Sequence, residues 1–361
     1  MKEPVDIHIW KRLVPSMRVA LNFLFCVVLL VTLWAVDRVF REKDLHGEAI
    51  EEFFSGNHGP DDFDVLAFGP SYVYCTLNPA QLYRDTGLRS FVPGTSIQPV
   101  EASYHYIRMA LKKYHPKLVI LGASMFVFHP APVRYKEGCA HMASDHIPFS
   151  LDKIRFLRDQ HLEDSIENYL VPWLKYHSRW KNLKKGDLLG TASHSPTVDV
   201  FMGFQLNTGC VTNQLKQLNL TKIPEAEMSG EYLDCLQKIA ELCAEKKVRL
   251  LLLNAPRANA LAEGRLVSLH RYARELGIDF LDLNEVLDET GIDNHTDYHD
   301  TDHLNVFGAA KATRYIGRYL QKRYGLPVDN SPAVCAEWNA LCAKYDKLEA
   351  NVLVAAKARK R

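Results

Sequence analysis

An aspartate and a histidine three positions apart, Asp300 and His303, stand at the start of a predicted helix near the end of the chain. This spacing lets a carboxylate hold Nδ1 of the imidazole while Nε2 points toward a nucleophile. The pair therefore predicts the acid and base of a serine-type catalytic site. The alternative interpretation is a charged capping loop, because Asp and Asn are common at helix N-termini.

A serine that could act as the nucleophile follows the first predicted strand, residues 63–68. Ser71 stands in the turn Gly69-Pro-Ser-Tyr72. Ligands bind beyond the carboxyl ends of parallel strands, so this turn is a natural place for a site. A tight turn would expose the hydroxyl and leave the amide free to face an oxyanion, as a serine nucleophile requires. The alternative role of Ser71 is a helix N-cap.

A metal site is a third interpretation of the same region. His295, His299 and His303 recur every four residues among aspartates, so three imidazoles would share one face of a helix. Most of that segment precedes the predicted helix, however. We therefore predict a catalytic acid–base pair, with no metal and no cofactor.

Alternating apolar and amphipathic segments predict the elements that position these residues. Five apolar runs predict strands, at residues 63–68, 88–92, 118–121, 248–253 and 278–283. The stretches between them predict helices, at residues 99–114, 230–245, 261–276 and 303–324. This order is typical of a parallel sheet covered by helices. We expect an α/β fold, a three-layer α/β/α sandwich with a mostly parallel five-stranded sheet.

The predicted α/β domain covers residues 44–330 and contains a looser insertion at about 129–222. The insertion is rich in aromatic residues, and Trp173, Tyr176 and Trp180 could stack on sugar rings or form the core of a cap. Residues 331–361 are predicted to form a helical, basic tail. The chain has 44 basic and 43 acidic side chains among its 361 residues, so no overall charge attracts nucleic acid.

Residues 1–43 are predicted to form an N-terminal cytoplasmic stub and a transmembrane anchor. No charged residue occurs at positions 19–36, and eighteen helical residues span about 27 Å, close to the bilayer core. A cleaved signal peptide and a buried core helix are the alternatives. Four basic residues before the span and three after it favour a cytoplasmic N-terminus. We expect a single-pass membrane protein whose main domain is extracytoplasmic.

Taken together, these motifs resemble those of SGNH/GDSL hydrolases. The shared features are a Gly-x-Ser turn after the first strand, a glycine after the second and Asp-x-x-His-Leu-Asn before the last helix. The chain is most similar to the membrane-anchored SGNH-like proteins of bacterial surface-polymer acylation. The similarity extends over about residues 61–324, and it implies an SGNH/flavodoxin-like sheet.

The resemblance assigns a role to each residue that matches the family pattern. It implies Ser71 as nucleophile, His303 as base and Asp300 as the orienting acid, with Gly94 donating an N–H to the oxyanion. The usual Gly-x-Asn-Asp block is replaced by Gly122-Ala-Ser-Met, so Ser124 is the predicted substitute for the asparagine donor. The residues predicted to bind substrate are Tyr72, Asn305, Trp173, Tyr176 and Trp180.

The resemblance also implies a function. We expect a serine esterase or O-acyltransferase that acts on acyl groups of a cell-surface glycan or glycopolymer in the cell envelope. A membrane-bound O-acyltransferase is an implied partner that would deliver the acyl group. The alternative is a catalytically weak or inactive SGNH-fold protein that binds or assembles with such a partner.

Overall fold

The computed structural model describes residues 15–133, 135–160, 162–189, 198–257 and 262–359, which form two units. The α/β unit consists of residues 44–170 and 193–361, and the N-terminal unit consists of residues 1–43 and 171–192. The predicted insertion at 129–222 is therefore divided between them. Its residues 171–192 group with the N-terminal helix instead of extending the α/β domain.

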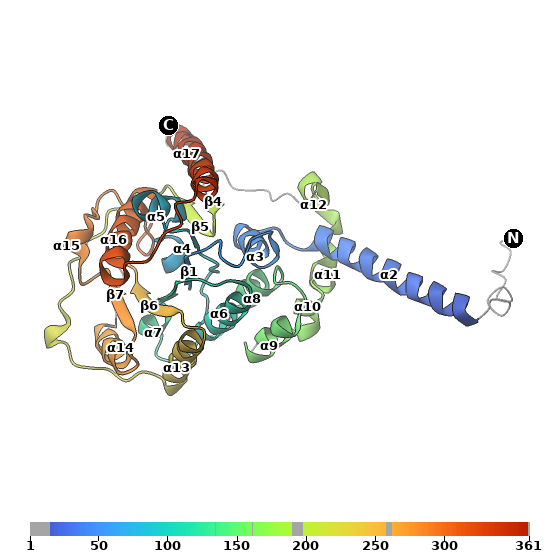
Figure 1. The fold of residues 1–361 in the computed structure, drawn as a ribbon, viewed down its shortest axis with the longest axis horizontal. Helices are drawn as coiled ribbons and strands as arrows, with labels where there is room; N and C mark the ends of the chain where they lie inside the picture. The colour runs from blue at the N-terminus through green and yellow to red at the C-terminus, as the bar shows by residue number, and fades with distance from the viewer. Residues whose placement is uncertain (1–14, 134, 161, 190–197, 258–261, 360–361) are drawn as a thin grey trace. The chain divides into compact units, whose positions relative to one another are not determined.

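A five-stranded, wholly parallel sheet forms the centre of the α/β unit (Figure 1). The strands lie in the order β2-β1-β3-β6-β7. Their bounds are Ser90–Phe91 for β2, Val65–Phe68 for β1, Leu118–Gly122 for β3, Arg249–Asn254 for β6 and Asp279–Asp282 for β7. The five predicted strands and their parallel pairing are confirmed, and all carboxyl ends meet at one edge of the sheet.

Strand β2 is shorter than the five residues predicted for it. Val92 donates its N–H to the carbonyl of Met202, in the turn of a separate two-stranded hairpin. That hairpin consists of β4, Val198–Phe201, and β5, Phe204–Asn207. Its turn passes so close to β2 that a Cβ on Gly203, where φ is +82°, would lie 2.0 Å from the Val92 carbonyl oxygen.

Apolar strands and amphipathic helices build the core. Every residue of β1 and β3 is buried. Helix α6 (Val100–Lys113) packs against β1 and α13 (Gly230–Glu245), while α16 (Val306–Tyr324) packs against α5 (Pro79–Thr86). Each of these helices presents its apolar stripe inward, as surface helices of an α/β fold do. The helices of the unit are α3 (Leu45–Ser55), α4 (Ser71–Tyr74), α5 (Pro79–Thr86), α6 (Val100–Lys113), α7 (Ser124–Phe128), α8 (Glu137–Ser144), α9 (Leu151–Asp159), α10 (Ile166–Leu170), α13 (Gly230–Glu245), α14 (Glu263–Glu275), α15 (Leu287–Thr290), α16 (Val306–Tyr324) and α17 (Pro332–Arg359).

The C-terminal segment is a long helix, α17, that packs on α5. Trp338 stacks on Tyr83 with ring centroids 5.1 Å apart. Farther along α17, the hydroxyl of Tyr345 accepts a hydrogen bond from the buried amide of Asn78. Much of this segment therefore contributes to the core of the α/β unit.

A buried ion cluster ties together the beginnings of three strands. Asp64, just before β1, accepts hydrogen bonds from the backbone and guanidinium of Arg89 and from Nζ of Lys117. Arg89 and Lys117 immediately precede β2 and β3, so the cluster fixes the register of the three strands. Burial by itself would raise the pKa of Asp64, but the hydrogen bonds from Arg89 and Lys117 outweigh burial and hold that pKa below its usual value.

Replacing Asp64 by alanine is expected to lower the free energy of unfolding by about 3–5 kcal/mol, because the buried guanidinium of Arg89 loses its partner. Urea unfolding followed by circular dichroism measures this loss, with the exposed Asp61→Ala as control. The stabilisation is present above the ordinary carboxyl pKa and is lost as the pH falls through the lower pKa of the folded state. The difference between wild type and Asp64→Ala should therefore shrink in acid; a constant difference would contradict this account.

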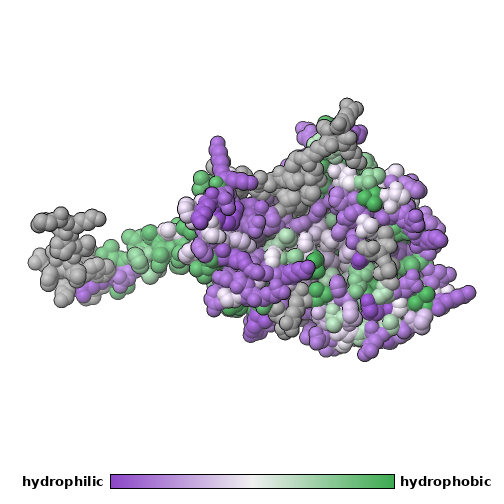
Figure 2. Space-filling view, turned by 180° about the vertical axis from the view of Figure 1, so that it is seen from behind, coloured by the Kyte–Doolittle hydropathy of each residue, from purple (hydrophilic) through white to green (hydrophobic). Residues whose placement is uncertain are grey.

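The N-terminal unit is dominated by the helix α2, Pro15–Phe40. Its segment Ser16–Phe40 has a mean hydropathy of 2.6 over its most apolar stretch and none of that stretch is buried. Figure 2 shows this apolar surface running along the helix. The helix is long and apolar enough to cross a membrane or to act as a signal anchor.

Residues 171–189 of the N-terminal unit pack at the end of α2. Asp37 accepts the backbone N–H of Trp173, and Arg179 donates to the carbonyls of Phe40 and Arg41. Arg179 is held in turn by Asp187, at 2.8 Å. The helices involved are α11 (Trp173–Tyr176), the 3-10 helix η1 (His177–Lys181) and α12 (Lys185–Leu189).

Candidate active site

Ser71 is the first residue of α4, immediately after β1 and a sharp turn. Gly69 enables the turn: its φ is +149°, and a Cβ there would lie 2.7 Å from the side chain of Val73 and 3.3 Å from the backbone of Gly122. A side chain is excluded by both conformation and space. At the first position of a helix the backbone N–H has no partner within the helix, so the amide of Ser71 is available to a ligand.

The segment before α16 brings the predicted base to this serine. Nε2 of His303 lies 2.7 Å from Oγ of Ser71, and Nδ1 lies 3.0 Å from both carboxylate oxygens of Asp300. Oδ1 of Asp300 also accepts the backbone N–H groups of Asp302 and His303, at 2.7 and 2.8 Å. The three predicted catalytic residues thus form one continuous chain of hydrogen bonds, although 232 positions separate Ser71 from His303.

The environment of Asp300 keeps its carboxyl group ionised. Partial burial opposes ionisation, but the hydrogen bond from His303 and the two backbone N–H groups outweigh it and lower the pKa of Asp300. An ionised Asp300 accepts the Nδ1 proton and thereby fixes the tautomer in which Nε2 is an acceptor. Nε2 can then take the hydroxyl proton of Ser71, which is the arrangement that activates a serine nucleophile.

Replacing Asp300 by asparagine is expected to lower kcat/KM for ester turnover by about 10²–10⁴-fold, with little change in KM, because the wrong histidine tautomer would face Ser71. Steady-state kinetics with a chromogenic ester measures the loss. The exposed Asp288→Asn is the control for removing one negative charge. Unchanged kinetics in Asp300→Asn would show that this carboxylate does not orient His303.

An aromatic and cationic layer holds the imidazole in place. The ring of Tyr72 stacks on His303 with centroids 5.4 Å apart and 17° between planes. Arg257 lies over Tyr72 and over Phe128, at 4.9 and 3.6 Å, and forms an ion pair with Asp302 at 2.9 Å. Burial raises the pKa of Tyr72 to about 12, so the phenol stays neutral. Tyr72, predicted to contact substrate, thus lies in the site.

Sequence reasoning missed Arg257 and Phe128. Neither residue belongs to a sequence motif. Arg257 lies in the loop after β6, and Phe128 is the last residue of α7. The signal that could have found Arg257 is its position just beyond the carboxyl end of a buried strand.

A cavity of about 440 Å³ opens beside Ser71 and His303. This volume is within the range of small-molecule sites. One wall is cationic, because Arg265, which donates to the carbonyls of Val127 and Phe128, lies there together with Arg257. The described residues that line the cavity are Pro70, Ser71, Tyr72, Ile97, Met125, Phe128, His129, Arg257, Ala262, Arg265 and His303.

Ile97, in the cavity wall, has an unusual backbone conformation. Its φ is +50°, a left-handed value that β-branched residues rarely adopt. The preceding loop is held by Gln98, whose side chain accepts both the N–H and the hydroxyl of Thr95. Strain of this kind persists where the surroundings fix it and is common at functional sites.

The predicted oxyanion donors do not converge as expected. Gly94 donates its N–H to the carbonyl of Val92, at 2.8 Å, so that amide is already engaged. Gly94 instead allows close packing, since a Cβ there would lie 2.6 Å from the Gly69 carbonyl oxygen. Ser124 is only 2% exposed and its hydroxyl has no hydrogen-bond partner among the residues that the structure describes, yet it does not line the cavity. The amide of Ser71 is the donor that the turn offers.

Asn305 caps a helix and does not face the cavity. Its Oδ1 accepts the N–H groups of Phe307 and Gly308, and its Nδ2 donates to the carbonyls of Gly209 and Thr296. The side chain is buried and all its hydrogen-bonding capacity is used. The predicted contact of Asn305 with substrate is therefore wrong: the residue fixes the start of α16, just after His303.

The aromatic residues predicted to line a substrate wall belong to the N-terminal unit. Trp173 and Tyr176 lie on α11, and Trp180, on η1, is 64% exposed with Lys181 over its ring. The aromatic side chains that line the cavity beside Ser71 are Tyr72 and Phe128. The aromatic side chains beside the triad thus come from the α/β unit, not from the segment predicted to supply them.

Two of the three histidines considered as metal ligands, His299 and His303, are engaged elsewhere. Nδ1 of His299 accepts the backbone N–H of Gly209, at 2.8 Å, and burial lowers the pKa of His299. Both nitrogens of His303 are used by Asp300 and Ser71. Among the described residues, the groups whose ligand atoms lie within 4.8 Å of one another do not include these three histidines.

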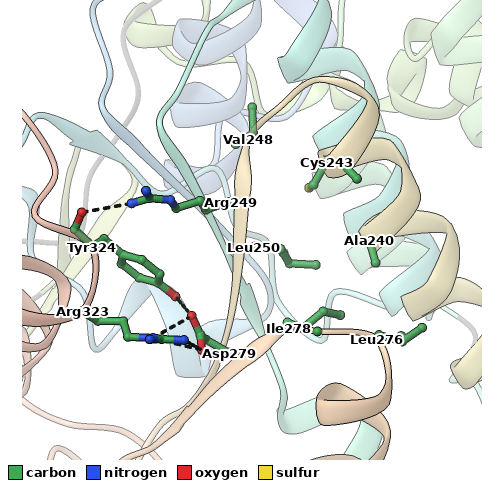
Figure 3. A pocket seen from close by; sticks show the side chains of 12 residues that line it. Ala240, Cys243, Val248, Arg249, Leu250, Leu276, Ile278, Asp279, Arg323 and Tyr324 are labelled. Carbon is green, nitrogen blue, oxygen red and sulfur yellow. Dashed lines mark hydrogen bonds and ion pairs between the residues drawn. The ribbon is translucent and has the colours of Figure 1, made fainter.

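A second cavity, of about 430 Å³, lies at the amino ends of β6 and β7, opposite the edge that carries Ser71 (Figure 3). Its charged groups bind one another: Arg323 and Tyr324 both donate to the carboxylate of Asp279. Burial raises the pKa of the Cys243 thiol, which lines the cavity, to about 12. A neutral thiol beside a satisfied ion pair does not form a nucleophilic site.

No model of a known protein family and no curated protein matches the chain. The geometry of the site is accordingly what indicates a function. That geometry is the hydrogen-bonded series Ser71, His303 and Asp300 at the mouth of a cavity.

Proposed function

We propose that the protein is a membrane-anchored serine esterase or O-acyltransferase of the SGNH type, acting on acyl groups of a cell-surface glycan or glycopolymer. The observation that carries the proposal is the 2.7 Å contact of Ser71 Oγ with His303 Nε2, with Asp300 3.0 Å from Nδ1. A chance cluster of polar residues would not arrange nucleophile, base and acid in the order that acyl transfer needs.

The proposed fold is a three-layer α/β/α sandwich of the SGNH/flavodoxin-like type, preceded by one transmembrane helix. The wholly parallel sheet supports it, because parallel strands are almost always covered on both faces. The pairing of α6 with α13 and of α16 with α5 is consistent with two separate helical layers.

In the proposed reaction, Oγ of Ser71 attacks the acyl carbonyl carbon while His303 Nε2 takes the hydroxyl proton. The carbonyl oxygen becomes an oxyanion that the amide of Ser71 can bind. The bond to the leaving alcohol then breaks, the alcohol takes the proton from Nε2, and an acyl-serine remains. Water or a sugar hydroxyl attacks the acyl-serine with His303 again as base, which gives an acid or a new ester and restores the free serine.

The cellular setting we propose follows from α2. A helix of this length and hydropathy would hold the protein in the membrane, with the α/β unit on the extracytoplasmic side. A membrane-bound O-acyltransferase is the proposed partner that would supply acyl groups to the site. The substrate would then be a polymer close to the outer surface of that membrane.

A second candidate function is a weakly active or inactive binding or assembly protein that has kept the fold. The specific observation in its favour is the incomplete oxyanion site, since the Gly94 amide bonds to Val92 and a serine replaces the asparagine donor. Loss of one such donor in other enzymes costs about 10²–10³ in turnover.

Acyl release and acyl transfer by the full-length protein in detergent would separate these candidates. An O-acetylated oligosaccharide serves as donor and an unacetylated one as acceptor. Release of acetate without transfer indicates an esterase, and acetylation of the acceptor indicates a transferase. Neither product, with or without a co-purified membrane acyltransferase, would favour the binding protein.

A further inference from the structure

A group of three potential ligands lies on the carboxyl side of β7, outside the triad. His270 comes from α14, Asp282 ends β7, and Glu285 follows it. Each offers one ligand atom, and these atoms all lie within 4.8 Å of one another. Nε2 of His270 and Oε2 of Glu285 are 2.9 Å apart but are not aligned as a hydrogen bond. Two atoms bound at about 2.1 Å to one ion would lie about 3 Å apart in octahedral and about 3.4 Å apart in tetrahedral coordination.

Asp282 supplies a second, independent observation that points to a cation ligand. Its side chain is 3% exposed. Oδ1 accepts hydrogen bonds from Nδ2 of Asn254 and from the backbone N–H and Nδ2 of Asn284. Oδ2 is buried and has no hydrogen-bond partner among the residues that the structure describes. A buried carboxylate in such surroundings is costly unless a positive charge balances it.

We propose that His270, Asp282 and Glu285 bind a divalent first-row transition-metal cation. One imidazole nitrogen with two carboxylate oxygens suits Zn²⁺ or Mn²⁺. The hard ions Mg²⁺ and Ca²⁺ prefer oxygen ligands alone. Asn254 holds Asp282 in place, because its Nδ2 donates to Oδ1 of Asp282 and leaves Oδ2 for the cation. Water would complete the coordination on the side where Glu285 reaches solvent.

The site connects to the loop that follows β6. Oδ1 of Asn284 accepts the backbone N–H of Arg257, and its Nδ2 donates both to Asp282 and to the carbonyl of Ala255. A cation on Asp282 would therefore stabilise the loop that carries Arg257, whose guanidinium lies over the ring of Tyr72. The role of the ion is structural, so the proposal does not depend on the chemistry proposed for Ser71.

Thermal unfolding of the full-length protein in detergent, stripped with a chelator, tests the site. Added Zn²⁺ or Mn²⁺ is expected to raise Tm by about 5 °C at a hundred-fold excess over Kd, because the ion binds only the folded chain. The same excess of Mg²⁺ should have a much smaller effect. Calorimetric titration should find one ion per chain.

Three variants assign the effect to these residues. His270→Gln and Glu285→Gln should lose the metal-induced rise in Tm, while the exposed His115→Gln keeps it. Asp282→Asn should also lose the metal-induced rise in Tm. Without metal, its Tm should be no lower than that of the wild type, because an uncompensated buried carboxylate has been removed. No rise in the wild type, or an undiminished rise in the three ligand variants, would overturn the proposal.

Discussion

Replacing Ser71 by alanine is expected to lower kcat/KM for acyl-ester turnover by at least about 10⁴-fold, because the variant can no longer form an acyl-serine. The fold should persist, since Ser71 is the first residue of the four-residue helix α4 and its hydroxyl bonds to His303, which Asp300 also holds. Steady-state turnover of a chromogenic acetyl ester measures the rate. Circular dichroism and Tm establish that the variant is folded.

The control for this substitution is Ser165→Ala, which removes an exposed hydroxyl elsewhere in the α/β unit. That variant should keep the wild-type rate. If Ser71→Ala also kept it, the turnover would arise from another group, and the assignment of the nucleophile would be wrong.

Replacing His303 by alanine is expected to reduce turnover about as much as the loss of Ser71. Without Nε2 at 2.7 Å, the hydroxyl of Ser71 has no acceptor for its proton. Because the two residues act as one unit, the double variant should be hardly slower than either single variant. The three rates, measured with one ester at one pH, give the comparison, and the exposed His115→Ala is the control.

A double variant slower than both single variants by the product of their effects would contradict this account. Independent effects of that kind would mean that Ser71 and His303 act in separate steps, instead of exchanging a proton. The geometry predicts strong coupling, because one hydrogen bond joins them and the carboxylate of Asp300 fixes the imidazole on its other side.

Local patterns in the sequence predicted the parts of the molecule that depend on short segments. The β6 segment is an almost continuous apolar run, as strands buried on both faces are, and its position was predicted to within a residue. The pair Asp300 and His303 was predictable for the same reason, since three residues of chain suffice to bring carboxylate and imidazole together.

Features that depend on distant segments were not predictable. The β4–β5 turn packs against Val92, whose carbonyl takes up the N–H of Gly94, and no local pattern encodes the contact of that turn. The position of Asn305 after His303 suggested a contact with substrate, but a carbonyl 96 residues away, that of Gly209, takes up its amide. Arg257 reaches Tyr72 only because β6 and β1 end at the same edge of one sheet.

These differences change the expected chemistry of the site. With the amide of Gly94 engaged, the oxyanion would be stabilised chiefly by the amide of Ser71. Fewer donors mean a smaller rate enhancement for a simple ester. A natural substrate that also contacts the cationic wall at Arg257 and Arg265 should be turned over faster than a small chromogenic ester.

Covalent labelling of Ser71 by a fluorophosphonate tests the central claim most directly, because this reagent reacts with activated serines and needs no knowledge of the substrate. The full-length protein in detergent is labelled, digested and analysed by mass spectrometry, beside His303→Ala and heat-denatured protein. Our account predicts one adduct, on the peptide that contains Ser71, which is absent from both controls. No adduct on the folded wild type, or equal labelling of His303→Ala, would contradict the claim that His303 activates Ser71 as a nucleophile.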